Sequence, residues 1–172
     1  YAKCGGNIFG ICGGLQMLGI SLEDPYMRES TDSQNQIKYS GINLIPIETT
    51  FGKIKNTSQR EEIISWPDTK VVKGFEMHYG QSNLINDGNS KIDSLFKNTS
   101  LGWIVEKKDK SFIGGTYLHG IFENDEWRRE WINKIRNIKG LDKLNKAIVN
   151  NNFDQREKSL NLLTDVFEKN IK

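Results

Sequence analysis

The chain has 172 residues, and its 24 lysines and arginines against 22 aspartates and glutamates leave a net charge of +2. The length suits one domain with a sizeable core, and no basic cluster interleaved with aromatics points to nucleic acid. No apolar run approaches the roughly 20 residues that span a membrane, and the start does not resemble a signal peptide. Two cysteines make no disulfide framework, and no Cys/His spacing fits a metal site. We therefore expect no metal, no nucleic acid, no membrane and a cytoplasmic location.

Cys12 lies where an apolar run changes into a helical pattern. Residues 7–11 are typical of a short buried strand, and residues 15–18 of the first turns of a helix. Glycines flank the cysteine as in the Gly-x-nucleophile-x-Gly elbow, where a tight turn exposes the nucleophile at the edge of a sheet. The positive end of a helix would favour the thiolate. We predict a nucleophile at Cys12, with a small buried structural cysteine as the alternative.

Cys4 provides an internal comparison. It too is followed by two glycines, but the apolar strand comes after it and not before it. Gly5 and Gly6 are typical of a helix end or turn that leads into that strand. Cys4 is therefore predicted to be structural.

The middle of the chain predicts strands and loops. Residues 19–41 are polar and are expected to form a loop, followed by a strand at 42–47 that Pro46 places at an edge or an end. Extended regions follow at 50–68, with a turn at 66–68, and at 71–84. A strand pair is expected at 101–105 and 112–118, joined by a charged turn.

The pattern becomes helical from Asp125 onward. Trp127, Trp131, Ile132 and Ile135 recur at steps of three and four residues. Residues 153–171 repeat the pattern, and we expect the stripe on each helix to face a core. The stripe on the second helix consists of Leu160, Leu163, Phe167 and Ile171.

A thiol nucleophile needs a base, and the chain has two histidines. His119 ends an apolar strand just before a glycine, where α/β enzymes place catalytic side chains. His78 lies in a second strand, and its alternation places it with Glu76 on the face opposite Phe75. Either histidine is also compatible with a structural role. The sequence favours His119.

Three segments together resemble a known family. Residues 10–19 (GICGGLQMLG) are similar to the nucleophile segment of class I, or triad-type, glutamine amidotransferases. Together with residues 74–80 (GFEMHYG) and 115–122 (GTYLHGIF), they resemble the C-terminal glutaminase domain of the cobyric acid synthase family in order and spacing. The match extends from Gly10 to about Arg128. The a,c-diamide synthases and other class I amidotransferases are the nearest alternatives, and a degenerate docking domain is a non-enzymatic one.

The resemblance implies an α/β fold with an open, doubly wound sheet and C-terminal helices. It makes residues 1–172 one amidotransferase domain, with residues 125–172 a helical tail. The chain begins without a methionine and almost directly on a core strand, so we expect that N-terminal strands and an ATP-dependent synthetase domain are missing. No phosphate-binding loop motif is present, and ATP and Mg²⁺ would belong to that missing domain. Half of the oxyanion hole would be missing too, so we expect little activity from the chain alone.

The resemblance also implies residue roles. Cys12 would attack the side-chain amide of glutamine, and His119 would transfer the proton. The Gly13 N–H would stabilise the oxyanion and Gln16 would hold the substrate. The ammonia would amidate corrinoid carboxylates through the synthetase domain. Most triad enzymes have a glutamate two residues after the histidine, where this chain has Ile121; Glu76 and His78 are candidates for orienting or supporting the catalytic pair.

Overall fold

The computed structural model describes residues 1–29, 37–85, 92–144 and 152–170. The chain divides into two compact units, Tyr1–Gly120 and Ile121–Lys172. All residues predicted for catalysis or substrate binding lie in the first unit.

One sheet of the first unit holds the strand that precedes Cys12. A short 3-10 turn, η1 (Ala2–Cys4), leads through Gly5, which has a φ of 76°, into β1 (Ile8–Ile11). The strand order is β1-β8-β7-β6, with β8 at Phe112–Thr116, β7 at Gly102–Glu106 and β6 at Asp93–Ser94. Strand β1 runs parallel to β8, and the other neighbours are antiparallel. The predicted strand pair and the turn after Cys4 are confirmed.

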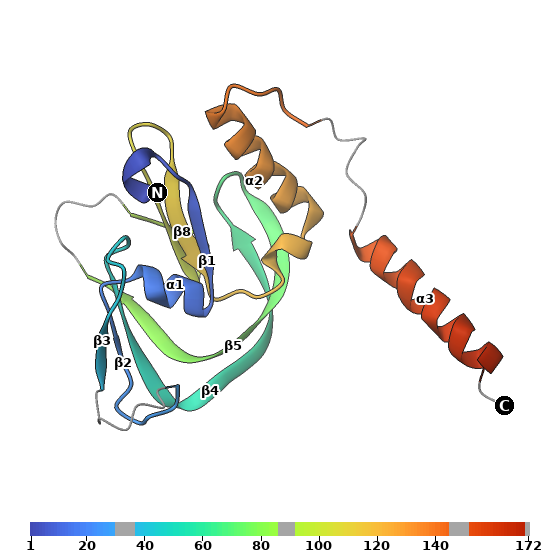
Figure 1. Cartoon of the computed structure of the whole chain (residues 1–172), viewed down its shortest axis with the longest axis horizontal. Helices are drawn as coiled ribbons and strands as arrows, with labels where there is room; N and C mark the ends of the chain where they lie inside the picture. The colour runs from blue at the N-terminus through green and yellow to red at the C-terminus, as the bar shows by residue number, and fades with distance from the viewer. Residues whose placement is uncertain (30–36, 86–91, 145–151, 171–172) are drawn as a thin grey trace. The chain divides into compact units, whose positions relative to one another are not determined.

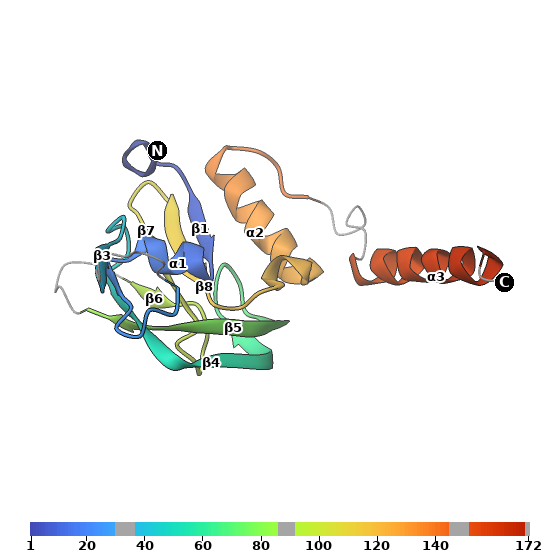
Figure 2. The same cartoon turned by 60° about the horizontal axis from the view of Figure 1, so that its bottom comes forward.

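The second sheet is dominated by a long hairpin. Its order is β3-β2-β4-β5, with β3 at Lys38–Ser40, β2 at Ser21–Glu23, β4 at Ile47–Ile64 and β5 at Lys70–Leu84. Figures 1 and 2 show β4 and β5 as two long strands that curve side by side. The turn expected at residues 66–68 joins them. Strand β5 passes the ends of both β1 and β8, which brings the two sheets together at the predicted site.

Two expectations about residues 19–47 are wrong. The predicted loop contains β2 and β3, although its residues 30–36 lie outside the described residues. The predicted strand at 42–47 is irregular before Ile47. The backbone N–H groups of Ile42 and Leu44 donate to Met17 O and Leu18 O, both at 2.8 Å. This segment therefore satisfies the carbonyls at the end of helix α1 (Gly13–Leu18) instead of pairing in a sheet.

The core of the first unit is apolar and closely packed around the two sheets and α1. Leu15 of α1, Ile47 of β4 and Ile113 of β8 are among its fully buried members. Gly10 and Gly115 are paired residues of β1 and β8. A Cβ at Gly10 would lie 2.6 Å from the Leu15 backbone nitrogen, so only glycine lets α1 pack this closely on β1.

The second unit is helical, as the sequence predicts. It contains η2 (Ile121–Glu123), α2 (Asp125–Ile138) and α3 (Asn152–Asn170). On α2, Trp127 is buried and contacts Phe122 edge to face. The prediction that the α3 stripe faces a core is wrong for its described members Leu160, Leu163 and Phe167, which are exposed, while Ile171 lies outside the described residues. Periodicity marks an apolar face but does not supply a surface to cover it. No described helix combines the length and apolarity needed to cross a membrane.

The contact between β1 and α1 makes a testable prediction. Substitution Gly10→Ala should lower the free energy of unfolding by about 1–3 kcal/mol, because the new methyl group meets the backbone of α1, which cannot move aside. The matched control is Gly14→Ala, where a Cβ meets nothing within 4 Å. Urea denaturation of both variants gives the comparison. Equal stability of the two variants would contradict the close contact.

Candidate active site

Cys12 occupies a strained turn between β1 and α1. Its φ of 51° and ψ of −111° lie outside the regions that side-chain-bearing residues favour. Its backbone N–H donates to Thr116 O of β8 at 2.8 Å, which continues the parallel pairing by one residue beyond β1. The predicted strand–turn–helix arrangement around the cysteine is confirmed. A strained backbone at a reactive side chain is typical of a nucleophile elbow.

The Cys12 side chain opens into a cavity of about 310 Å³. Gly13 and Gln16 of α1 line this cavity, together with His78 of β5. The Cys12 thiol lies 3.9 Å from the backbone carbonyl oxygen of Met77, which is also on β5. The cavity thus brings together four of the predicted site residues, Cys12, Gly13, Gln16 and His78, and His119 is not among the residues that line it.

The electrostatics of Cys12 differ from the sequence expectation. Burial raises the pKa of its thiol, and this effect exceeds the lowering of the pKa by a hydrogen bond from the Gly13 N–H. Two charged residues act in opposite directions: Glu29 raises the pKa and Lys55 lowers it. The expected preference for the thiolate is therefore not present before substrate binds. Helix α1 has six residues, and its positive end does not outweigh desolvation of the charged sulfur.

His119 and Cys12 approach β5 at neighbouring positions, His119 at Phe75 and Cys12 at Met77. The backbone N–H of His119 donates to Phe75 O at 2.8 Å, and its carbonyl accepts from the Phe75 N–H at 3.2 Å. Its ring stacks on the Phe75 ring with centroids 5.0 Å apart. Phe75 precedes Met77 by two residues, which along a strand is about 7 Å. The buried Nε2 of His119 has no hydrogen-bond partner among the described residues.

His78, in contrast, is fully engaged. Its Nδ1 lies 2.7 Å from Gly80 O, and its Nε2 lies 3.0 Å from a Glu76 carboxylate oxygen. These contacts engage both ring nitrogens of His78 with groups other than the Cys12 thiol. Between the two histidines, only His119 has a ring nitrogen that lacks a partner among the described residues.

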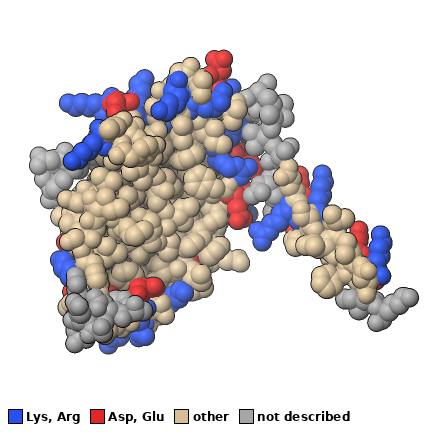
Figure 3. Space-filling model, viewed as in Figure 1, with Lys and Arg blue, Asp and Glu red and all other residues tan. Residues whose placement is uncertain are grey.

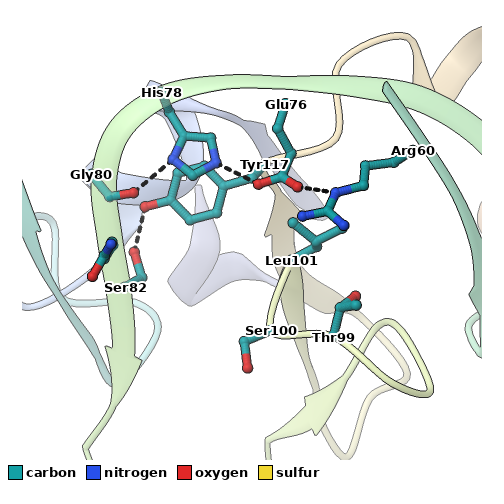
Figure 4. A pocket seen from close by; sticks show the side chains of 10 residues that line it. Arg60, Glu76, His78, Gly80, Ser82, Thr99, Ser100, Leu101 and Tyr117 are labelled. Carbon is teal, nitrogen blue, oxygen red and sulfur yellow. Dashed lines mark hydrogen bonds and ion pairs between the residues drawn. The ribbon is translucent and has the colours of Figure 1, made fainter. Parts of the chain in front are cut away.

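Glu76 is the centre of a buried polar cluster. Its side chain is 2% exposed and accepts hydrogen bonds from Asn56 at 2.6 Å, from His78 and from the Arg60 guanidinium. No hydrogen bond joins it to His119 in the described part of the chain. The predicted orienting residue therefore holds His78. Figure 4 shows Arg60, Glu76 and His78 of this cluster on the wall of a second cavity, of about 230 Å³, which shares His78 with the first.

A chain of buried hydroxyls supports Gln16. The Gln16 side-chain amide donates to the Tyr117 hydroxyl at 3.2 Å, and Tyr117 lies 2.7 Å from the Ser82 hydroxyl. Ser82 in turn lies 2.6 Å from the Thr49 hydroxyl. Since Tyr117 accepts from Gln16, its own proton can go to Ser82. The His78 ring stacks on the Tyr117 ring with centroids 3.9 Å apart, which further restricts the tyrosine.

Sequence reasoning missed these supporting residues. Tyr117 lies two residues before His119 in the segment 115–122 that resembles the family. This position could have marked Tyr117 as a candidate site residue. Ser82 and Thr49 carry no such signal, because Ser82 meets Tyr117 only in the folded chain and Thr49 meets Ser82 through the pairing of β4 with β5.

Fold and site together define a glutamine amidotransferase domain. Residues 1–127 match the CobB/CobQ-like glutamine amidotransferase domain, so the chain belongs to that family, and the expected α/β class is confirmed.

The chain is 69% identical over 171 residues to cobyric acid synthase from Prochlorococcus marinus strain NATL1A. It is 68% identical to that of strain NATL2A and 45% identical to that of strain MIT 9313. In each comparison 99% of this chain is covered, but it spans only 34% of the relative's length.

The raised pKa of Cys12 predicts a shifted labelling profile. In a Cys4→Ser background, iodoacetamide labelling of Cys12 should reach half its maximal rate at a higher pH than labelling of a peptide with residues 7–18. Burial keeps the thiol protonated as the pH rises through the range in which the peptide cysteine ionises. Mass spectrometry over a pH series measures both profiles. A midpoint equal to or below that of the peptide would contradict the effect of burial.

The chain of buried hydroxyls predicts that removal of the Tyr117 hydroxyl destabilises the protein. Substitution Tyr117→Phe should lower the free energy of unfolding by about 1–3 kcal/mol, because it leaves the buried Gln16 amide and Ser82 hydroxyl without this partner. The matched control is Tyr79→Phe on the cavity wall, whose hydroxyl has no described partner; it should change stability by less than about 0.5 kcal/mol. Chemical denaturation tests this difference, and equal losses would rule out a special role for Tyr117.

Proposed function

We propose that this chain hydrolyses glutamine as the glutaminase part of a cobyric acid synthase. The observation that carries the proposal is the strained Cys12 elbow, which opens into a cavity beside Gln16 and the Gly13 N–H. The names of the full-length relatives support the narrower assignment over the a,c-diamide synthases.

The reaction needs a thiol, a proton carrier and an oxyanion site. Cys12 Sγ attacks the carboxamide carbon of glutamine and passes its proton to His119. The Gly13 N–H stabilises the oxygen of the tetrahedral intermediate. When the carbon–nitrogen bond breaks, His119 returns the proton and ammonia leaves a γ-glutamyl thioester. Water then attacks the thioester, which releases glutamate and restores the thiol.

We assign the proton transfer to His119 because of the hydrogen-bond partners of the two histidine rings. The Nε2 of His119 is buried without a partner among the described residues, whereas both ring nitrogens of His78 face acceptors. His78 lines the cavity and His119 does not, so substrate binding would have to bring His119 and the thiol together. Catalytic hydrogen bonds are often long before substrate binds.

The ammonia acceptor lies outside this chain in our proposal. Amidation of corrinoid carboxylates requires acyl activation by ATP, and the described residues contain no cluster of three metal-ligating side chains. The sequence also lacks a phosphate-binding loop motif. The residues present therefore do not fit an ATP–Mg²⁺ site. We assign that step to the part of the full-length protein that the relatives contain beyond the matched length.

Substitutions at the thiol and the two histidines test the proposal. In the full-length protein, Cys12→Ala should abolish glutamate formation and labelling by a glutamine-mimicking diazo-ketone. His119→Asn should lower both rates by about a hundredfold or more, because proton transfer is lost. The matched control His78→Asn should retain both to within about tenfold, since His78 supports the site without exchanging protons. In the full-length protein, synthesis from added ammonia should survive all three changes.

Each part of the proposal has its own contrary result. Glutamine-dependent synthesis by the Cys12→Ala full-length protein would indicate a docking role and overturn the enzymatic proposal. Loss of activity in His78→Asn with retention in His119→Asn would exchange the roles of the histidines.

A further inference from the structure

The cavity beside Cys12 has one lysine and one glutamate on its wall. Among the described residues, Lys55 is its only lysine or arginine and Glu29 its only carboxylate. Apolar side chains such as Met17, Leu22 and Phe51 form much of the remainder. Figure 3 shows that the face on which α1 lies is largely free of charged side chains, which gather at its margins. The Arg28 guanidinium lies 6.0 Å from the centroid of the Tyr79 ring, but Arg28 is not among the residues that line the cavity.

An irregularity of β4 brings Lys55 to the cavity. Phe51 pairs with Gly80, but the next paired residue, Asn56, is opposite His78. Residues 52–55 thus oppose Tyr79 alone, and such bulges re-aim side chains next to active sites. The Lys55 ammonium lies 5.6 Å from the centroid of the Tyr79 ring, on the cavity wall.

A capped turn brings Glu29 to the same cavity. The buried Asp24 carboxylate accepts the backbone N–H groups of Arg28 and Glu29, each at 2.9 Å. These bonds hold the backbone of Glu29, so its position does not depend on its own side chain. Neither Glu29 nor Lys55 forms an ion pair within the described part of the chain.

We propose that Lys55 binds the α-carboxylate of glutamine and Glu29 its α-ammonium group. This inference rests on the glutaminase function proposed above. A free α-amino acid carries one charge of each sign, which the two side chains complement. The carboxamide would then extend toward Cys12 and Gln16. The pair would select a zwitterionic amino acid over a carboxamide within a peptide, which has neither charge.

Glu29 and Lys55 have opposite effects on the pKa of the Cys12 thiol. These effects support the placement of both residues at the cavity, and any labelling experiment has to control for them. Glu29 raises and Lys55 lowers the pKa of Cys12, so both lie within electrostatic range of the sulfur. Removal of either charge would change thiol reactivity even without a role in binding. The test therefore uses a protection constant, the ligand concentration that halves iodoacetamide labelling of Cys12, because this midpoint does not depend on the intrinsic labelling rate.

The experiment compares glutamine with two analogues on the Cys4→Ser chain. L-Glutaminamide lacks the α-carboxylate, and glutaramate lacks the α-ammonium. Lys55→Ala should weaken protection by glutamine about tenfold, as expected for a lost charge-assisted bond, and leave protection by L-glutaminamide unchanged. Glu29→Ala should weaken protection by glutamine by a similar factor and leave protection by glutaramate unchanged.

Matched variants complete the design. Lys53→Ala removes a lysine from the same irregular segment that does not line the cavity, and Glu61→Ala removes an exposed carboxylate from β4. Both should protect as the parent chain does. Equal constants for Lys55→Ala and Lys53→Ala, or equal weakening of glutamine and L-glutaminamide by Lys55→Ala, would overturn the assignment while the glutaminase proposal stands. Failure of glutamine to protect the parent chain, together with no diazo-ketone labelling, would overturn both.

Discussion

The parallel pairing of β1 with β8 is the constraint on which the site depends. Strand β1 leads to Cys12 and β8 leads to His119, so parallel alignment delivers both residues to one edge of the sheet. The bond from the Cys12 N–H to Thr116 O extends this alignment into the elbow itself. The close approach of α1 at Gly10 completes the turn, because a larger residue would separate the helix from the strand. An antiparallel arrangement would send the two segments to opposite edges.

Strand β5 serves the site with both of its faces. The Phe75 side chain on one face stacks on His119, and the backbone carbonyl of Met77 lies 3.9 Å from the Cys12 thiol. Glu76 and His78 on the other face belong to the buried ionic cluster. The second set does not reach the reacting atoms directly. It restrains Tyr117, which holds the Gln16 amide, so a charge cluster supports the proposed substrate-binding residue Gln16 through an aromatic ring. Buried charges of this kind remain stable only when each is paired, as Glu76 is with Arg60.

Predictions from local sequence patterns were correct where neighbouring residues alone determine the structure. The elbow glycines predicted the turn at Cys12, and alternation on β5 separated Phe75 from Glu76 correctly. The strand predicted at residues 42–47 was wrong because its backbone caps the end of α1, a partner that no local pattern reveals. The expected thiolate was wrong for a similar reason, since helix position predicts a lower pKa whereas burial raises it. The apolar stripe of α3 was identified, but its exposure was not.

The sequence alone identified the family and predicted the reactive groups. Residue types and spacing around Cys12, His119 and Gln16 were sufficient, because a nucleophile elbow and its following helix are local structures with strict residue requirements. Only the tertiary structure decided which of these groups meet. Hydrogen bonds to Glu76 and Gly80 occupy His78, and Lys55 reaches the cavity through a change of strand register. These relations join residues distant in the chain, and their physical basis is pairing between strands, which local sequence does not encode.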